Sequence, residues 1–74
     1  MMLALPQAAA VRVEILDVAG RIVRKLPTAR MIAGEHRIGW DGKGGDGRAV
    51  SPGAYWAAVW VNDRRLVRHV VALR

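Results

Sequence analysis

The chain has 74 residues, a formal net charge of +6 and a hydrophobic content of 53%. This length allows one domain with one core, and the apolar content is too high for an intrinsically disordered tail. No apolar run is long enough to cross a bilayer, and the absence of cysteine excludes disulfides, thiolate zinc sites and cysteine nucleophiles. The basic excess favours acidic partners such as nucleic acid, anionic lipid or anionic glycan.

The first part of the chain predicts a β-hairpin. Residues 11–15 alternate apolar and charged side chains with a period of two, which indicates a strand with one buried face. Asp17 and Gly20 then stand at the two ends of a tight turn. Residues 21–26 are expected to form the return strand, and Pro27, which lacks a backbone donor, is expected to end it. A helix is the alternative here, but the β-branched residues and Gly20 disfavour it.

The middle of the chain predicts a further strand and then a loop. After Gly34, the side chains of His36, Ile38 and Trp40 would share one face of a strand. Residues 41–47 contain four glycines, so this segment is expected to form an irregular loop in which glycines take positive φ.

The longest strand candidate covers residues 54–61, between turn signals at residues 51–53 and 62–63. Large apolar side chains alternate between its two faces: Tyr55, Val59 and Val61 on one, Trp56 and Trp60 on the other. Two apolar faces indicate a central strand, or an outer face that something else covers. Exposed indole surface costs about 25 cal/mol per Å², so either loops of this chain or a partner should cover the two tryptophans.

A final strand is expected over residues 65–73, with Val67, Val71 and Leu73 on one face and Arg68 on the other. Strands at a spacing of about 8–12 residues, separated by Gly and Pro turns, indicate an antiparallel sandwich or barrel. The sequence therefore predicts an all-β fold.

No pattern in the sequence predicts a catalytic or metal site. Asp41 and Asp46 would offer Ca²⁺ only two carboxylates beside Lys43, whereas this cation takes six to eight oxygens. His36 and His69 have no Cys or carboxylate at the spacing of zinc ligands. The single serine lies outside any nucleophile elbow, and no carboxylates are paired. We therefore expect a protein that is not an enzyme and needs no cofactor or metal.

The arginines suggest nucleic-acid binding as an alternative, because small basic β domains can bind strands through phosphate contacts and base stacking. The basic residues are spread over every expected strand: Arg12, Arg21, Arg24, Arg37, Arg48, Arg64, Arg65 and Arg68. Trp40 is in phase with Ile38, which favours a core position over a stacking platform. A solvated basic surface is the simpler interpretation, so nucleic-acid binding ranks third among the hypotheses.

A series of motifs covers about residues 5–74: Asp17-Val18-Ala19-Gly20-Arg21, Ala33-Gly34-Glu35-His36, Trp40-Asp41-Gly42, Asp46-Gly47-Arg48-Ala49-Val50, Pro52-Gly53-Ala54-Tyr55 and Val70-Val71-Ala72-Leu73-Arg74. In this order and spacing the chain resembles the FlgD immunoglobulin-like family. The sorting domains of type IX secretion share the DxxGR and PGxY-like elements and are a neighbouring family. The resemblance implies a small immunoglobulin-like Greek-key β-sandwich with no catalytic residues.

The resemblance also implies structural roles for the motif residues, with glycines in turns and two aromatic side chains in the core. These structural residues are Asp17, Gly20, Arg21, Gly34, Trp40, Asp41, Gly42, Gly47, Pro52, Gly53 and Tyr55.

The chain departs from the family at its first strand. Family members usually have a fuller strand here, whereas only residues 1–5 precede Pro6, so the first strand of this single domain (residues 1–74) is expected to be truncated. An open strand edge leaves backbone groups unpaired, and another copy or a donor strand could complete it by β-augmentation. The candidate interface therefore comprises Met1, Met2, Leu3, Trp56 and Trp60.

The resemblance implies a non-enzymatic module for attachment, sorting or assembly, usually at the C-terminal end of an exported bacterial protein or in the flagellar scaffold. We expect an extracellular or cell-surface location and other protein domains as partners, with an anionic surface or glycan as a further candidate. Residues 1–6 are too short for a secretory signal and lack a basic region, so such a signal would lie elsewhere. The alternative is a self-assembling subunit whose open edge and Trp56/Trp60 face contact neighbouring copies in a ring or filament.

Overall fold

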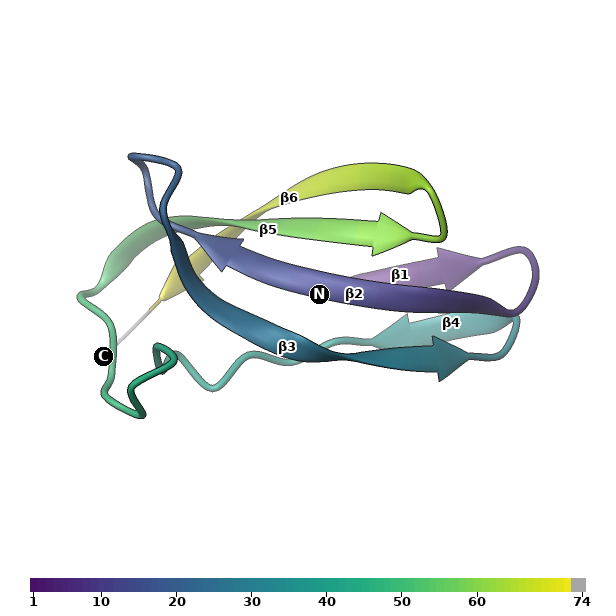
Figure 1. The fold of residues 1–74 in the computed structure, drawn as a ribbon, viewed down its shortest axis with the longest axis horizontal. Coiled ribbons are helices and arrows are strands. Elements are labelled where there is room, and N and C mark those ends of the chain that lie inside the picture. Colours follow the sequence, from purple (N-terminus) through teal and green to yellow (C-terminus); the bar gives the residue numbers. More distant parts are fainter. Residues whose placement is uncertain (73–74) are drawn as a thin grey trace.

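The computed structural model describes residues 1–72, which form six antiparallel strands in two sheets (Figure 1). The strands are β1 (Met2–Leu5), β2 (Ala9–Leu16), β3 (Ile22–Met31), β4 (Gly34–Arg37), β5 (Gly53–Val61) and β6 (Arg64–Ala72). The larger sheet has the order β3-β2-β5-β6, and β1 pairs with β4 in a two-stranded sheet. The two sheets pack together, which confirms the predicted all-β, immunoglobulin-like sandwich. In this part of the chain, no helix has the length and hydropathy that crossing a membrane requires.

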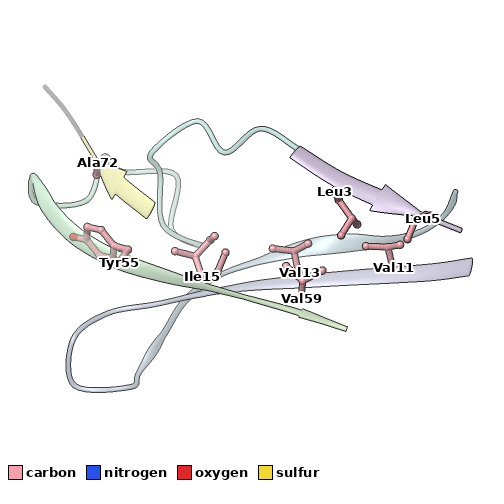
Figure 2. Close-up of a cluster of buried hydrophobic side chains, with 9 residues drawn as sticks. Leu3, Leu5, Val11, Val13, Ile15, Tyr55, Val59 and Ala72 are labelled. Atoms are coloured by element: carbon pink, nitrogen blue, oxygen red, sulfur yellow. The ribbon is translucent and has the colours of Figure 1, made fainter. Parts of the chain in front are cut away.

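The core lies between the sheets and is almost entirely aliphatic (Figure 2). On β2, buried and exposed residues alternate from Ala9 to Ile15, as its period of two predicts. The buried cluster comprises Leu3, Leu5, Val11, Val13, Ile15, Tyr55, Ala57, Val59 and Ala72. Ile38 and Trp40 pack against this cluster, as their spacing indicated, but β4 ends at Arg37, so the expected strand does not extend to these two residues.

The return strand of the first hairpin is longer than predicted. β3 continues through Pro27 as far as Met31, so the expectation that Pro27 ends the strand is wrong. The pairing register shifts between Val11 and Val13, and the shift leaves Pro27 in a bulge opposite β2. Because β3 is also an edge strand, a residue without a backbone N–H is tolerated at this position.

The face of β6 that carries Val67 and Val71 is turned outward, although its apolar residues suggest an inner face. Val67 and Val71 do share a face opposite to Arg68, but this face is the outer one, where they are 43% and 54% exposed. The pairing with β5 sets this orientation, because Leu66 lies opposite the buried Val59. Leu73 lies outside the described residues.

The turn between β2 and β3 is organised by one carboxylate. Asp17 Oδ1 accepts hydrogen bonds from the backbone N–H groups of Ala19 and Arg21, each at 2.9 Å. Asp17 Oδ2 accepts a third, from Nε of Arg21, also at 2.9 Å. Gly20 completes the turn at a φ of 84°, in the left-handed region where a Cβ would be strained.

Two aromatic side chains connect the glycine-rich loop to the core. The rings of Trp40 and Tyr55 meet edge to face, with centroids 5.4 Å apart. The indole N–H of Trp40 donates to the carbonyl of Lys43 at 2.9 Å, and the Tyr55 hydroxyl donates to the carbonyl of Ser51 at 2.6 Å. Asp41 Oδ1 accepts from the backbone N–H of Lys43 at 3.0 Å. Five further motif residues lie in loops or at the first residue of a strand: Gly34, Gly42, Gly47, Pro52 and Gly53.

The position of the core predicts that two isoleucines contribute very differently to the free energy of unfolding. Ile15 is 2% exposed at the centre of the cluster, whereas Ile32 is 75% exposed. We expect Ile15→Ala to lower the free energy of unfolding by about 2–5 kcal/mol, because it leaves a cavity, and Ile32→Ala to change it by less than about 0.5 kcal/mol. Urea unfolding followed by tryptophan fluorescence measures both. Equal losses for the two variants would contradict the assigned core.

The Asp17 turn predicts a pH-dependent contribution to stability. The hydrogen bond from the backbone N–H of Arg21, supported by the Arg21 side chain and the Ala19 N–H, holds the pKa of Asp17 below its ordinary value. Such a carboxyl stabilises the fold above its unfolded-state pKa, and this stabilisation is lost as pH falls through its folded-state pKa. We therefore expect Asp17→Asn to lower the urea midpoint at pH 7, and the loss to shrink below about pH 4.

Asp63→Asn is the matched control for this measurement. Asp63 also lies in a turn, and its carboxylate has no ion pair or hydrogen bond within residues 1–72. Its urea midpoint should follow that of the original chain at every pH. A difference between Asp17→Asn and the original chain that stays constant from neutral to acid pH would disprove the role of the carboxylate charge.

Candidate interaction surface

The outer face of the larger sheet, turned away from β1 and β4, holds the two candidate interface tryptophans. β5 is a central strand, paired with β2 on one side and β6 on the other. Its inner positions, including Tyr55 and Val59, are buried in the core, so the alternate positions Trp56 and Trp60 face outward. Ala58, between the two indoles, is 0% exposed because its larger neighbours cover it.

Trp60 is flanked by two arginines. The strand register places Arg12 of β2 and Arg65 of β6 directly opposite Trp60. The guanidinium carbon of Arg12 lies 4.2 Å from the indole centroid, and that of Arg65 lies 5.4 Å from it. Both are within cation–π distance, and their aliphatic stems help to keep Trp60 half-buried.

Trp56 is more open. It is 40% exposed, and its ring centroid lies 4.7 Å from that of His69, its register partner on β6. Val67 and Val71 lie on either side of His69 along the same face of β6 and are both exposed. We call the residues Trp56, Trp60, Val67, His69 and Val71 the tryptophan face.

Within residues 1–72, no carboxylate lies within ion-pair distance of the two arginines beside Trp60. Within residues 1–72 the ion pairs are Arg21 with Asp17 and Arg24 with Asp41, and neither includes Arg12 or Arg65. The two arginines beside Trp60 therefore present positive charge next to exposed apolar surface. Arginine in this position can bind a carboxylate of a partner through two parallel hydrogen bonds.

The three N-terminal candidate residues lie on the other sheet. Leu3 is 6% exposed and belongs to the core of its own chain, because alternate residues of β1 point inward, so it is not part of an exposed surface. Met1 also packs against the core, and its amino group donates to the carbonyl of Ile38 at 2.8 Å. Met2 is 53% exposed. The structure thus does not bring the five candidate residues together in one surface.

Sequence reasoning identified Trp56 and Trp60 but missed the residues that surround them. These are Arg12, Arg65, Val67, His69 and Val71, contributed by β2 and β6. No local motif marks them, since they meet only through the register of three strands. They could have been found from the sequence only by aligning each alternating strand with the strands expected to pair with it.

Residues 1–72 do not assemble the metal site or the base-stacking platform that the sequence analysis considered. His36 and His69 lie on different sheets, and the ring of His36 contacts the carbonyl of Ile32 at 2.6 Å. No group of three His, Cys, Asp or Glu residues that could hold a metal occurs in the part of the chain that is described. Trp40 and Tyr55 pack in the core region, so they are not stacking platforms for bases.

Comparison with known proteins identifies the family. The FlgD Ig-like domain model matches residues 1–64. The basal-body rod modification proteins FlgD of Salmonella typhimurium and of Salmonella typhi are each 42% identical over 49 residues, which cover 66% of this chain and 21% of the relative. The chain thus spans about a fifth of the length of these curated relatives, and no solved structure matches it. Because the family model covers most of its residues, this chain belongs to the FlgD Ig-like domain family.

Proposed function

We propose that this domain is a non-enzymatic assembly module that binds another protein through the tryptophan face. The matched relatives are named as basal-body rod modification proteins, which supports a role in a bacterial assembly. The domain would belong to an exported bacterial protein and act at or outside the cell surface. The same proposal includes attachment or sorting of that protein as alternatives to assembly.

The observation that supports the proposal most is the combination of exposed apolar surface with preordered arginines. Trp56, Val67 and Val71 are each at least 40% exposed on a paired sheet. Tryptophan and arginine are the residue types most enriched where interface binding energy concentrates. Because Trp60 already holds Arg12 and Arg65 in place, these side chains lose less conformational freedom on binding.

The same charges favour a different protein over a second copy as the partner. Two tryptophan faces brought together about a twofold axis at Trp60 would place Arg12 and Arg65 of one copy near those of the other. The chain has a net charge of +6, so like charges would meet at the centre of such a contact. Like-charge contacts of this kind disfavour a partner, and a partner with carboxylates opposite these arginines fits better. Self-assembly is therefore the second candidate.

Removal of Trp56 tests the proposal. We expect the chain to co-sediment with purified Salmonella basal bodies, and Trp56→Ala to weaken this binding by about tenfold or more. Ile32→Ala, which removes an equally apolar exposed side chain from a loop outside this face, should bind like the original chain. Absence of binding by the original chain, or equal binding by both variants, would disprove the proposal.

Molar mass in solution separates the second candidate from the first. Light scattering after gel filtration should give the monomer mass of 8.1 kDa at low and high salt. Oligomers that resist salt and are lost in Trp56→Ala would instead establish self-assembly through the tryptophan face.

A further inference from the structure

A second surface, separate from the tryptophan face, lies at the free edge of β1. Within residues 1–72, β1 pairs with β4 and with no other strand. Met1 and Ile38 exchange two backbone hydrogen bonds of 2.8 Å, which sets the phase of this antiparallel ladder. By the alternation of such ladders, Leu3 and Leu5 direct their backbone groups toward β4, and Met2 and Ala4 direct theirs away. The N–H and C=O groups of Met2 and Ala4 thus form an open strand edge.

Two hollows lie between the sheets, and the open edge borders one of them at Ala4. One, of about 410 Å³, is lined at the end of β1 by Ala4 and Leu5 and on the opposite side by Val61 and Leu66. The other, also of about 410 Å³, is lined by Met1, which precedes β1, and by Val70. Each hollow therefore reaches the inner face of β6. In Figure 1, β4 is drawn beside β3 and β1 between β2 and β5, whereas β6 lies at the far edge of the larger sheet.

The inner face of β6 alternates cationic and aliphatic side chains. Arg64, Leu66, Arg68 and Val70 pair with inner positions of β5, so all four lie on the side of the sheet that faces the hollows. Leu66 and Val70 are only partly buried. Arg64 and Arg68 are exposed and have no ion pair in the described residues. These two positive charges lie on the side of the sheet that faces the hollows, so they favour an incoming segment that has carboxylates at matching positions.

We propose that an extended segment of a partner protein, with acidic and aliphatic residues at alternate inward positions, adds to β1 as a third strand of the smaller sheet. Its backbone pairs with the free groups of Met2 and Ala4. Its aliphatic side chains fill the hollows against Leu66 and Val70, and its carboxylates pair with Arg64 and Arg68. The fit requires an acid at i and i+4 and an aliphatic residue at i+2 and i+6, since side chains alternate across a strand.

A second copy of this chain does not meet this requirement. Its acids are Glu14, Glu35 and four aspartates, and no strand has two acids four residues apart. Its net charge of +6 also opposes docking of one copy beside Arg64 and Arg68 of another. The positive charges of Arg64 and Arg68 therefore favour a different protein, with alternating acidic and aliphatic residues, as the strand that binds at the β1 edge.

Peptide binding tests the occupant. The probe is a fluorescein-labelled peptide, Glu-Thr-Val-Thr-Glu-Thr-Val-Thr, whose inward positions alternate acid and valine. The control, Glu-Val-Thr-Thr-Glu-Val-Thr-Thr, has the same composition but places acid and valine on opposite faces. We expect the probe to bind about tenfold more tightly than the control by fluorescence anisotropy, and its affinity to fall as salt is added. No binding of the probe, or equal binding of both peptides, would overturn the proposal.

Two variants locate the binding site. Ala4→Pro removes the free N–H of the β1 edge but leaves the ladder to β4 intact, since that N–H points away from β4. Arg68→Gln removes one exposed charge and should preserve the fold. We expect Ala4→Pro to abolish probe binding and Arg68→Gln to weaken it by about fivefold. Urea midpoints of both variants establish that they fold, and unchanged binding in either would overturn the proposal.

The tryptophan face supplies the control that separates this inference from the proposed function. Trp56→Ala lies on the opposite face of the larger sheet and should bind the probe like the original chain. Addition of the probe should also protect the N–H of Ala4 from hydrogen exchange without changing that of Leu3, which already faces β4. A dimeric chain that becomes monomeric in Ala4→Pro would assign the edge to a second copy and overturn the choice of occupant.

Discussion

The pairing of β5 with β2 and β6 is the constraint on which the rest of the structure depends. It places Val59 between Val13 and Leu66 on the inner face and Trp60 between Arg12 and Arg65 on the outer face. Because side chains alternate along a strand, a slip of one residue would move the tryptophans inward and the core residues into solvent. Ala57 and Val59 on the inner face of β5 are small and buried between the sheets, whereas the indoles of Trp56 and Trp60 lie on the outer face. Core packing and the outer surface are thus set by one register.

The size of the smaller sheet explains why the domain has two distinct surfaces. β1 and β4 have four residues each, against eight to ten in the strands of the larger sheet. The smaller sheet therefore leaves the inner face of β6 partly uncovered, next to an open edge at β1. The outer face of the larger sheet has no covering layer among the described residues, and its own arginines shield one of the two indoles. One surface offers aromatic and cationic side chains, and the other offers backbone groups with a defined charge pattern.

The residues to which the resemblance assigned structural roles, from Asp17 to Tyr55, lie in turns, at the start of strands or in the core, away from either surface. Asp17 holds the hairpin turn through three hydrogen bonds, and Trp40 and Tyr55 attach the glycine-rich loop through their polar atoms. These contacts are local, and all except the one between the Asp17 and Arg21 side chains satisfy a backbone group that a loop would otherwise leave to water. These residues therefore support the fold, whereas the strands form the two surfaces, including Val70 and Val71 of the last motif.

The sequence by itself determined the strands with a clear period of two, the turns at Asp17 and Asn62, and the core position of Trp40. Local pattern suffices there, because alternation and turn chemistry act over a few residues. The tertiary structure alone decided that β3 continues past Pro27, that Val67 and Val71 face outward and that Leu3 is buried. It also decided which arginines flank Trp60. These features depend on the register between strands far apart in the chain, and that register is set by packing between the sheets, which no short segment encodes.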